Sequence, residues 1–340
     1  MKNFIKLSVL IQVLLFSCEK EEKALAAAFI EDRVGFADMV SENGLDYQKQ
    51  VYFDLSRNKN VGDNFKDEWD FAFGCEAQEP NIFVNSALLM RVAPTGISDF
   101  SQTLDPKDFE EEFQFERSKN YFKKGIIKKD FHALDPQGEV FIIDLGLSLN
   151  NQARGYKKFQ ILEFTQGEYK IQIADLNSNN KKEYRILGDA NFNNVYLSLS
   201  KPNEILKIEP PKEDWDIVFT KYMQRLFDGV DSVDYSVTGC LLNPFQTQAY
   251  LYQNFTIDSS SSFYNLKASN IIHENFSDNS DVIGHEWKRF DLNGTAKFII
   301  LAHKFYFIQD NRGVNYRLRF TGFYNQQGDK GSVSFEFLEI

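Results

Sequence analysis

The fold of this chain is decided by an octapeptide that occurs twice, as KDEWDFAF at residues 66–73 and as KEDWDIVF at residues 212–219. Each copy follows a second matching segment, VYFDLS at residues 51–56 and VYLSLS at residues 195–200. The two segments recur at offsets of 146 and 144 residues, and chance would rarely give both matches at nearly the same spacing. The chain therefore contains an internal repeat, which has to be found before any local pattern is interpreted.

A third match closes each copy of the repeat. It pairs VFIID (140–144) and GYKKF (155–159) with FYFIQ (305–309) and NYRLRF (315–320). These matches divide the chain into a first half, residues 46–188, and a second half, residues 189–340. The Asn-rich stretch at residues 177–182, together with residues 188–194, is the natural junction between them.

Most segments of the repeat alternate apolar and polar residues in the period of a strand. Val333, Phe335 and Phe337 alternate with serine and glutamate, which predicts a half-buried antiparallel strand. The stretch before it, residues 325–331, contains two glycines that can take positive φ, so the chain should end in a β-hairpin. Helical pattern is confined to short segments, chiefly residues 106–117. The predicted fold class is all-β: two repeated, antiparallel β-rich halves with minor short helices.

Composition supports a β-rich globular protein and excludes some partners. Of the residues, 43% are hydrophobic, and 33 Phe and 15 Tyr favour pleated, half-buried surfaces. The formal net charge is −11, and it becomes −13 once Lys2 and Lys6 are removed with a leader peptide. Nucleic acid and anionic lipid headgroups need a basic surface, so neither is an expected partner.

The first residues predict export. Lys2 and Lys6 precede an apolar run that ends at Phe16, and Ser17 stands directly before Cys18, which is typical of a signal peptide over residues 1–17. The segment resembles a lipobox, which implies that the Cys18 thiol carries a lipid anchor. The alternative is a plain secretory signal with an incidental cysteine.

The segment behind the cysteine, residues 18–45, is predicted to be a lipidated tether. Its charged stretch, residues 20–22, resembles the export signal of Bacteroidetes lipoproteins and implies a location on the outer membrane, facing the cell exterior. A solvated charge run would look the same. Cys75 and Cys240 remain, and in an oxidising compartment they could pair. Two cysteines do not make a disulfide framework, so two buried thiols are expected instead.

Several segments resemble the HmuY-like lipoproteins of Bacteroidetes. WDFAF (69–73), IFVNSA (82–87) and TGISDF (95–100) resemble the amino-terminal part of that family. YRLRFTGFY (316–324) with GDKGSVSF (328–335) resembles its carboxy-terminal hairpin. With the repeat, the resemblance covers most of residues 46–340 and implies a tandem of two HmuY-like halves.

The resemblance implies an all-β surface lipoprotein that takes part in iron acquisition. Its best-known members bind haem between two axial histidines or methionines and act beside a TonB-dependent outer-membrane receptor, so haem or a haemoprotein is an implied partner. One family histidine follows a Trp-x-x-Phe element; here that element is residues 287–290, and the matching position falls near Leu292, which cannot ligate iron. The other lies in a variable middle region, where residues 245–275 offer only His273.

Four residues are therefore candidate haem ligands: His273, His285, Met90 and Met223, since haem iron accepts imidazole or thioether ligands. The structural alternatives are plain. His285 follows Gly284 and also suits an ordinary histidine at a loop edge, and Met90 follows two leucines and suits core packing. No pair of histidines has the spacing of a zinc site, so no metal site is predicted.

The sequence contains no catalytic signature such as Gly-x-Ser-x-Gly, a phosphate-binding glycine loop or His-Glu-x-x-His, so the protein is predicted not to be an enzyme. Acid pairs at residues 67–68 and 213–214 precede a tryptophan in both halves. Because these acids recur with the repeat, a structural role is favoured, with solvated acids at a strand entrance and Trp69 and Trp215 as anchors of each half.

Two functions remain open. The first is a surface-exposed lipoprotein that captures haem and hands it to an outer-membrane receptor. The second is a binding or accessory module without haem: a receptor partner, a glycan binder or an interaction protein.

Overall fold

The computed structural model describes residues 33–40, 47–127, 138–201, 204–227, 229–253 and 259–340. The predicted signal peptide, Cys18 and most of the tether lie outside the described residues. In the described part of the chain, no helix has the length and apolar character needed to cross a bilayer.

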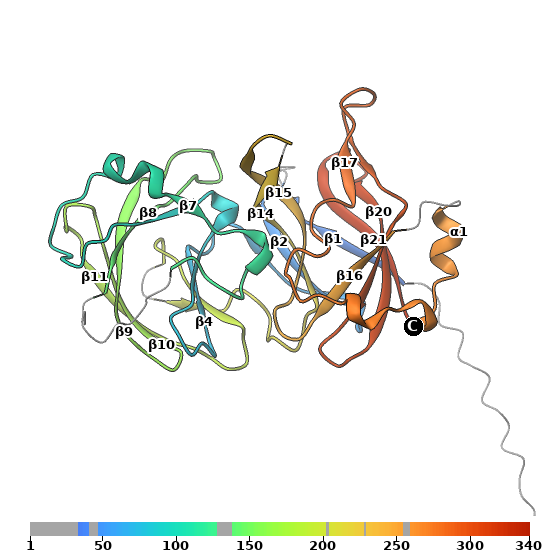
Figure 1. Cartoon of the computed structure of the whole chain (residues 1–340), viewed down its shortest axis with the longest axis horizontal. Coiled ribbons are helices and arrows are strands. Elements are labelled where there is room, and N and C mark those ends of the chain that lie inside the picture. The colour runs from blue at the N-terminus through green and yellow to red at the C-terminus, as the bar shows by residue number, and fades with distance from the viewer. Residues whose placement is uncertain (1–32, 41–46, 128–137, 202–203, 228, 254–258) are drawn as a thin grey trace, which may run out of the picture. The chain divides into compact units, whose positions relative to one another are not determined.

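Ten strands that are consecutive in sequence build one β-sandwich, here called the insert sandwich (Figure 1). Its first sheet has the order β11 (Lys182–Leu187), β10 (Glu168–Ala174), β9 (Tyr156–Thr165), β8 (Val140–Asp144), β6 (Arg91–Pro94) and β7 (Gln114–Phe115). Its second sheet has the order β13 (Ile205–Leu206), β12 (Asn194–Leu197), β4 (Phe71–Gly74) and β5 (Ile82–Val84). Apolar side chains from both sheets, such as Phe71, Phe159 and Val195, form one core between them.

The strands on either side of this stretch build a second sandwich, here called the host sandwich. Its first sheet has the order β1 (Arg33–Asp38), β21 (Lys330–Glu339), β20 (Asn315–Tyr324), β19 (Lys304–Gln309) and β16 (Gln248–Gln253). Its second sheet has the order β15 (Ser232–Leu242), β14 (Ile217–Phe227), β2 (Lys49–Asp54) and β3 (Lys59–Phe65). A short ribbon, β17 (Lys288–Phe290) with β18 (Phe298–Ile300), completes the described strands.

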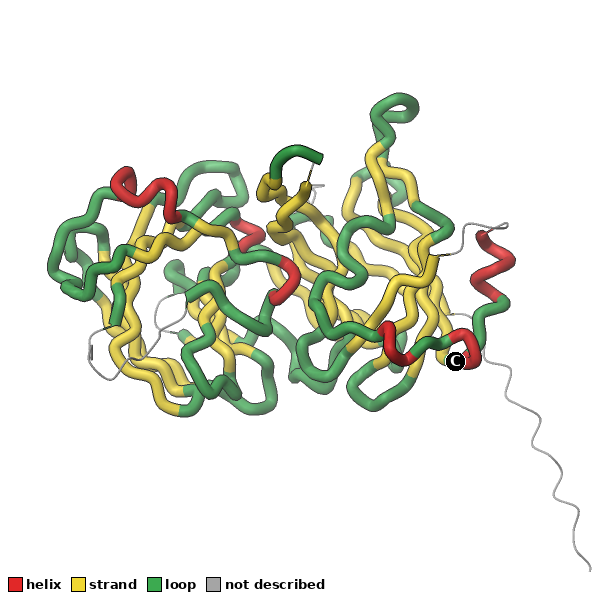
Figure 2. Tube along the Cα trace, in the orientation of Figure 1, coloured by secondary structure: helices red, strands yellow, loops and turns green. Residues whose placement is uncertain are grey.

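All strand pairs are antiparallel and the described helices are short (Figure 2), so the predicted all-β class with minor helices is confirmed. The helices are α1 (Ser259–Tyr264) and five 3₁₀ turns, η1 (Ser86–Leu88), η2 (Pro106–Glu112), η3 (Ser118–Asn120), η4 (Ala268–Asn270) and η5 (His273–Asn275). The predicted terminal hairpin is confirmed as β20 and β21, with Gly328 and Gly331 at φ of 90° and 113°.

The helix predicted over residues 106–117 is shorter than expected and of the 3₁₀ type. Asp105 caps it by accepting a hydrogen bond from the backbone N–H of Lys107, and it ends at Glu112. Phe113 then takes extended backbone, and Gln114 and Phe115 pair with β6. Strand pairing at the sheet edge therefore overrides the local helical pattern.

The two repeats exchange their first strands. β2 and β3 precede the first Trp-Asp pair, yet β2 pairs with β14 of the second repeat. In the same way β12 precedes the second Trp-Asp pair and pairs with β4 of the first repeat. The strand before each exchanged strand is also equivalent in the two sandwiches. β1 precedes β2 and pairs with β21, and β11 precedes β12 and pairs with β10. The junction expected at residues 188 and 189 falls between β11 and β12, within the insert sandwich.

The repeated aspartate fastens each exchanged strand. Asp70 Oδ2 accepts a hydrogen bond from the backbone N–H of Leu199, just after β12, at 2.6 Å. Asp216 Oδ2 accepts the equivalent bond from Leu55, just after β2, at 2.7 Å. A residue just after each exchanged strand therefore donates a hydrogen bond to an aspartate of the sheet that the strand joins.

The residues around these aspartates match the expected structural pattern. Trp69 and Trp215 are fully buried, whereas Asp67 and Glu213 are exposed. Cys75 and Cys240 are buried and free, which confirms the prediction of two buried thiols.

The two aspartates differ in their charge partners, which gives a paired prediction. Asp70 forms an ion pair with Arg154 at 2.5 Å, whereas burial raises the pKa of Asp216 from 3.8 to about 7. Between pH 3.8 and about pH 7, Asp216 holds a proton in the folded protein that it loses in the unfolded chain. The contribution of Asp216 to stability therefore falls as pH rises through this range. Asp216→Asn should therefore unfold at an equal or higher urea concentration than the wild type at pH 8. Asp70→Asn should lose about 1.5–3 kcal/mol, because it weakens a charged hydrogen bond.

The strand exchange predicts which fragment folds alone. Residues 66–210 contain every strand of the insert sandwich, whereas residues 46–187 contain β2 and β3 without β14 and lack β12. The first fragment should give a β-type circular dichroism spectrum and a cooperative unfolding transition, and the second should not. Cooperative unfolding of the second fragment alone would contradict this pairing.

Candidate ligand-binding pocket

A pocket of about 570 Å³ opens on the host sandwich between two hairpins. One wall comes from β14 and β15, and the other comes from the β17–β18 ribbon and its loop. The apolar lining consists of Leu226, Val237, Phe290, Leu292 and Phe298. A volume of this size with mostly apolar walls is typical of a small-molecule site.

The two hairpins form walls because they extend beyond the sheets (Figure 1). β14 pairs with β15 over eleven residues but with β2 only at Ile217–Phe219. Beyond that point its described backbone pairing on this side is a single isolated bridge between Met223 and Arg117. Large apolar side chains stay in solvent here: Phe227 is 70% exposed and Leu292 82%. Exposed apolar groups that gather at one site usually mark a binding surface.

His285 lines this pocket. The residue before it, Gly284, takes a φ of 61°, which glycine adopts readily, and it forms reciprocal backbone hydrogen bonds with Cys240. The Nδ1 atom is buried and has no hydrogen-bond partner. Burial, followed by the charge of Lys288, lowers the pKa of His285 to about 4. The ring is therefore neutral at pH 7, the form that can ligate a metal.

Lys288 lines the same pocket and is 6% exposed. Its Nζ lies 4.2 Å from the ring centre of Trp287 and 4.5 Å from that of Phe323, and it donates a hydrogen bond to the Thr238 carbonyl at 2.5 Å. Burial lowers the pKa of Lys288 from 10.5 to about 7. The pocket therefore has an aromatic floor with an amine embedded in it.

The other predicted haem ligands do not line this pocket. His273 is exposed in η5, with its ring centre 6.1 Å from that of Phe276. Met90 is fully buried in the core of the insert sandwich. Met223 is buried on β14, opposite Ser236. The structure thus brings His285, but not the other three candidates, to the pocket.

Sequence reasoning missed Lys288. The segment Trp287 to Phe290 shows a lysine and an arginine side by side, and strand alternation places them on opposite faces without saying which face is buried. The structure decides it: Lys288 is buried and Arg289 is exposed.

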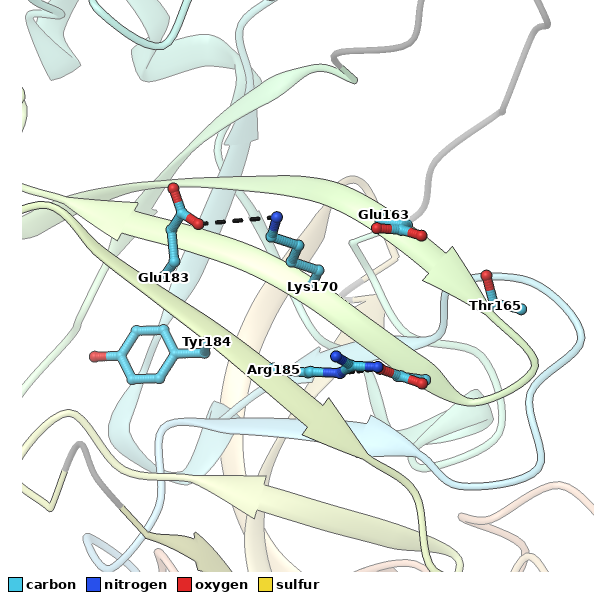
Figure 3. Close-up of a pocket in the computed structure, with 7 residues that line it drawn as sticks. Glu163, Thr165, Lys170, Glu183, Tyr184 and Arg185 are labelled. Carbon is cyan, nitrogen blue, oxygen red and sulfur yellow. Dashed lines mark hydrogen bonds and ion pairs between the residues drawn. The ribbon is translucent and has the colours of Figure 1, made fainter.

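A second pocket, of about 510 Å³, lies on the outer face of β9, β10 and β11 in the insert sandwich (Figure 3). Its lining is mostly charged, and four of the charged side chains form ion pairs: Lys170 Nζ lies 4.0 Å from Glu183 Oε2, and Arg185 contacts Glu168. These pairs leave fewer charged groups for a ligand than the pocket of the host sandwich does. Among the described residues, no three His, Cys, Asp or Glu side chains form a group that could hold a metal ion.

The buried amine predicts an unusual stability change. Lys288→Met should stabilise the ligand-free protein, because methionine fills a similar volume and removes a buried charge. Between pH 7 and 10.5 the unfolded chain holds a proton that folded Lys288 has released, so the wild type loses stability as pH falls through this window. The gain of the variant should therefore be larger at pH 6 than at pH 9, measured by urea unfolding. A less stable variant at pH 6 would contradict it.

Comparison with known proteins identifies the family. The family model described as HmuY protein matches residues 46–187 and again residues 190–337. A search of curated proteins finds no match.

Solved structures give distant likenesses. Apo PinO from Porphyromonas gingivitis has 10% identity over 91% of this chain and 97% of its own, with a TM-score of 0.27. A candidate HmuY-like heme-binding protein from Bacteroides vulgatus has 14% identity over 50% of this chain and 84% of its own, at 0.24. A candidate lipoprotein from Bacteroides fragilis has 11% identity over 52% and 92%, at 0.23.

The family match covers both repeats and far more than half of the chain. It agrees with the expected resemblance and with the all-β fold. HmuY proteins are binding proteins and are not known as enzymes. This chain belongs to the HmuY family, with two consecutive HmuY segments.

Proposed function

We propose that this protein is a surface lipoprotein that captures haem in the pocket of the host sandwich and hands it to an outer-membrane receptor. One observation carries the proposal: the buried Nδ1 atom of His285 has no partner and belongs to a group that lines an apolar pocket. A buried polar atom normally has a hydrogen-bond partner, so an unpartnered imidazole nitrogen on a pocket-lining residue supports a ligand-binding role.

The residues around His285 suit haem. Haem is a flat apolar ring that carries an iron and two carboxylates, and its iron accepts a neutral imidazole as an axial ligand. Phe290 and Phe298 provide aromatic surface for the ring, and Lys288 and Lys330 provide positive charge for the carboxylates. The protein supplies binding and orientation in this scheme and performs no chemistry on the cargo.

Capture and hand-off follow from the predicted anchor and the exposed hairpins. A lipid on Cys18 would hold the protein at the outer membrane, where haem or a haemoprotein is the source. The apolar side chains of Phe227 and Leu292 flank the pocket and stay in solvent, so a TonB-dependent receptor could contact the same surface that holds the cargo.

The second candidate function is binding of a ligand other than haem, as a receptor partner, a glycan binder or an interaction module. It is favoured by one observation: of the four candidate axial ligands, His285 lines the pocket and His273, Met90 and Met223 do not. A haem held by one protein ligand would leave the other axial position to water or to a further group.

Haemin titration separates the two functions. Purified residues 19–340 should shift the Soret band at micromolar haemin, and His285→Ala should weaken binding at least tenfold, because it removes the iron ligand. Three matched controls, His273→Ala, Met90→Leu and Met223→Leu, should leave the spectrum unchanged.

The result that refutes haem binding is an unshifted Soret band in the wild type at micromolar haemin. A normal shift in His285→Ala would instead retire His285 as the ligand.

A further inference from the structure

Below about pH 7, the ammonium of Lys288 is a buried cation without an anionic partner. It donates a hydrogen bond to the Thr238 carbonyl and lies over the rings of Trp287 and Phe323. Among the residues that the structure describes, no carboxylate forms an ion pair with it. Taking a charge out of water costs several kcal/mol unless a counter-charge and further hydrogen bonds compensate. Aromatic faces alone recover only part of this cost.

The insert sandwich contains a buried lysine whose three hydrogen-bond donors all have acceptors. Lys158 is also fully buried and its Nζ lies 4.7 Å from the Phe100 ring centre. Its ammonium donates to three oxygens, the carbonyls of Phe100 and Gln102 and the hydroxyl of Ser178. An ammonium has three donors, so Lys158 is satisfied. Lys288 uses one donor on a protein oxygen, and it lines a pocket, whereas Lys158 does not.

The position of Lys288 beside His285 defines the ligand further. The two side chains are three residues apart and line the same pocket. A ligand can supply an interaction partner for each side chain. The imidazole can bind a metal or another electrophile, and the ammonium can donate to an acceptor, preferably an anionic one. The walls between them are apolar, so the rest of the ligand has to be apolar as well.

We propose that Lys288 is the receptor for a carboxylate of the ligand, so that the pocket selects an apolar molecule carrying carboxylates. The identification of this carboxylate as a propionate of a porphyrin rests on the proposed function. Recognition through Lys288 does not involve the iron, so it extends to the iron-free porphyrin.

Protoporphyrin IX and its dimethyl ester test the inference, because they differ only in the carboxylates. Binding to residues 19–340 is measured by quenching of tryptophan fluorescence. The wild type should bind the acid at least tenfold more tightly than the ester, which is about 1.4 kcal/mol. Lys288→Met should bind the acid and the ester equally, at the level of the wild type with the ester.

Lys304→Met is the matched control. It also removes a positive charge near His285, but Lys304 pairs with Glu286 at 3.3 Å and does not line the pocket. This variant should keep the wild-type preference for the acid. Urea unfolding of each variant shows that a loss of binding is not a loss of fold.

The outcomes separate this inference from haem binding. A wild-type preference for the acid that survives in Lys288→Met, the absence of any preference, or no binding of protoporphyrin IX each overturns the inference. If haemin still shifts the Soret band through His285, the proposed function stands without it. A preference for the acid that depends on Lys288, with no Soret shift, supports the inference and refutes haem as the cargo.

Discussion

The structure depends on two buried carboxylates that each accept a backbone N–H from the far repeat. Asp70 binds the chain just after β12, and Asp216 binds it just after β2. In both cases the backbone N–H of the aspartate also donates to the strand carbonyl, Leu197 or Phe53. Asp70, which pairs with Arg154, is a charged acceptor, and a charged acceptor gives the strongest kind of hydrogen bond. Asp216 can accept its hydrogen bond in the protonated form as well. Because the bonds are reciprocal, neither repeat completes its sheets without the other.

The pocket arises where the two repeats stop being alike. In the insert sandwich, β4 and β5 are four and three residues long, and the sheet ends with them. Their counterparts in the host sandwich, β14 and β15, each have eleven residues and continue past the sheet. The β17–β18 ribbon supplies the facing wall. The repeat therefore provides a stable frame, and the site is built from what the second copy adds to it.

Two basic groups, His285 and Lys288, give the pocket its chemistry. Both are held by burial in states that bind ligands: the imidazole is neutral and the ammonium lacks a counter-charge. Unpartnered polar groups of this kind lower stability, and proteins keep them mainly at functional sites. The buried Lys158 of the insert sandwich is the contrasting case, because three oxygens accept hydrogen bonds from its ammonium.

The family, the all-β class, the two repeats, the terminal hairpin and the buried thiols could be predicted from the sequence, because alternation, repetition and motifs are visible without the fold. His285 could be named as one of four candidates. The strand exchange, the packing of Met90 and Met223 away from the pocket, and the burial of Lys288 rather than Arg289 become visible in the folded chain. Strand pairing and burial depend on residues more than a hundred positions apart, and a period-two pattern is the same for either partner and either face.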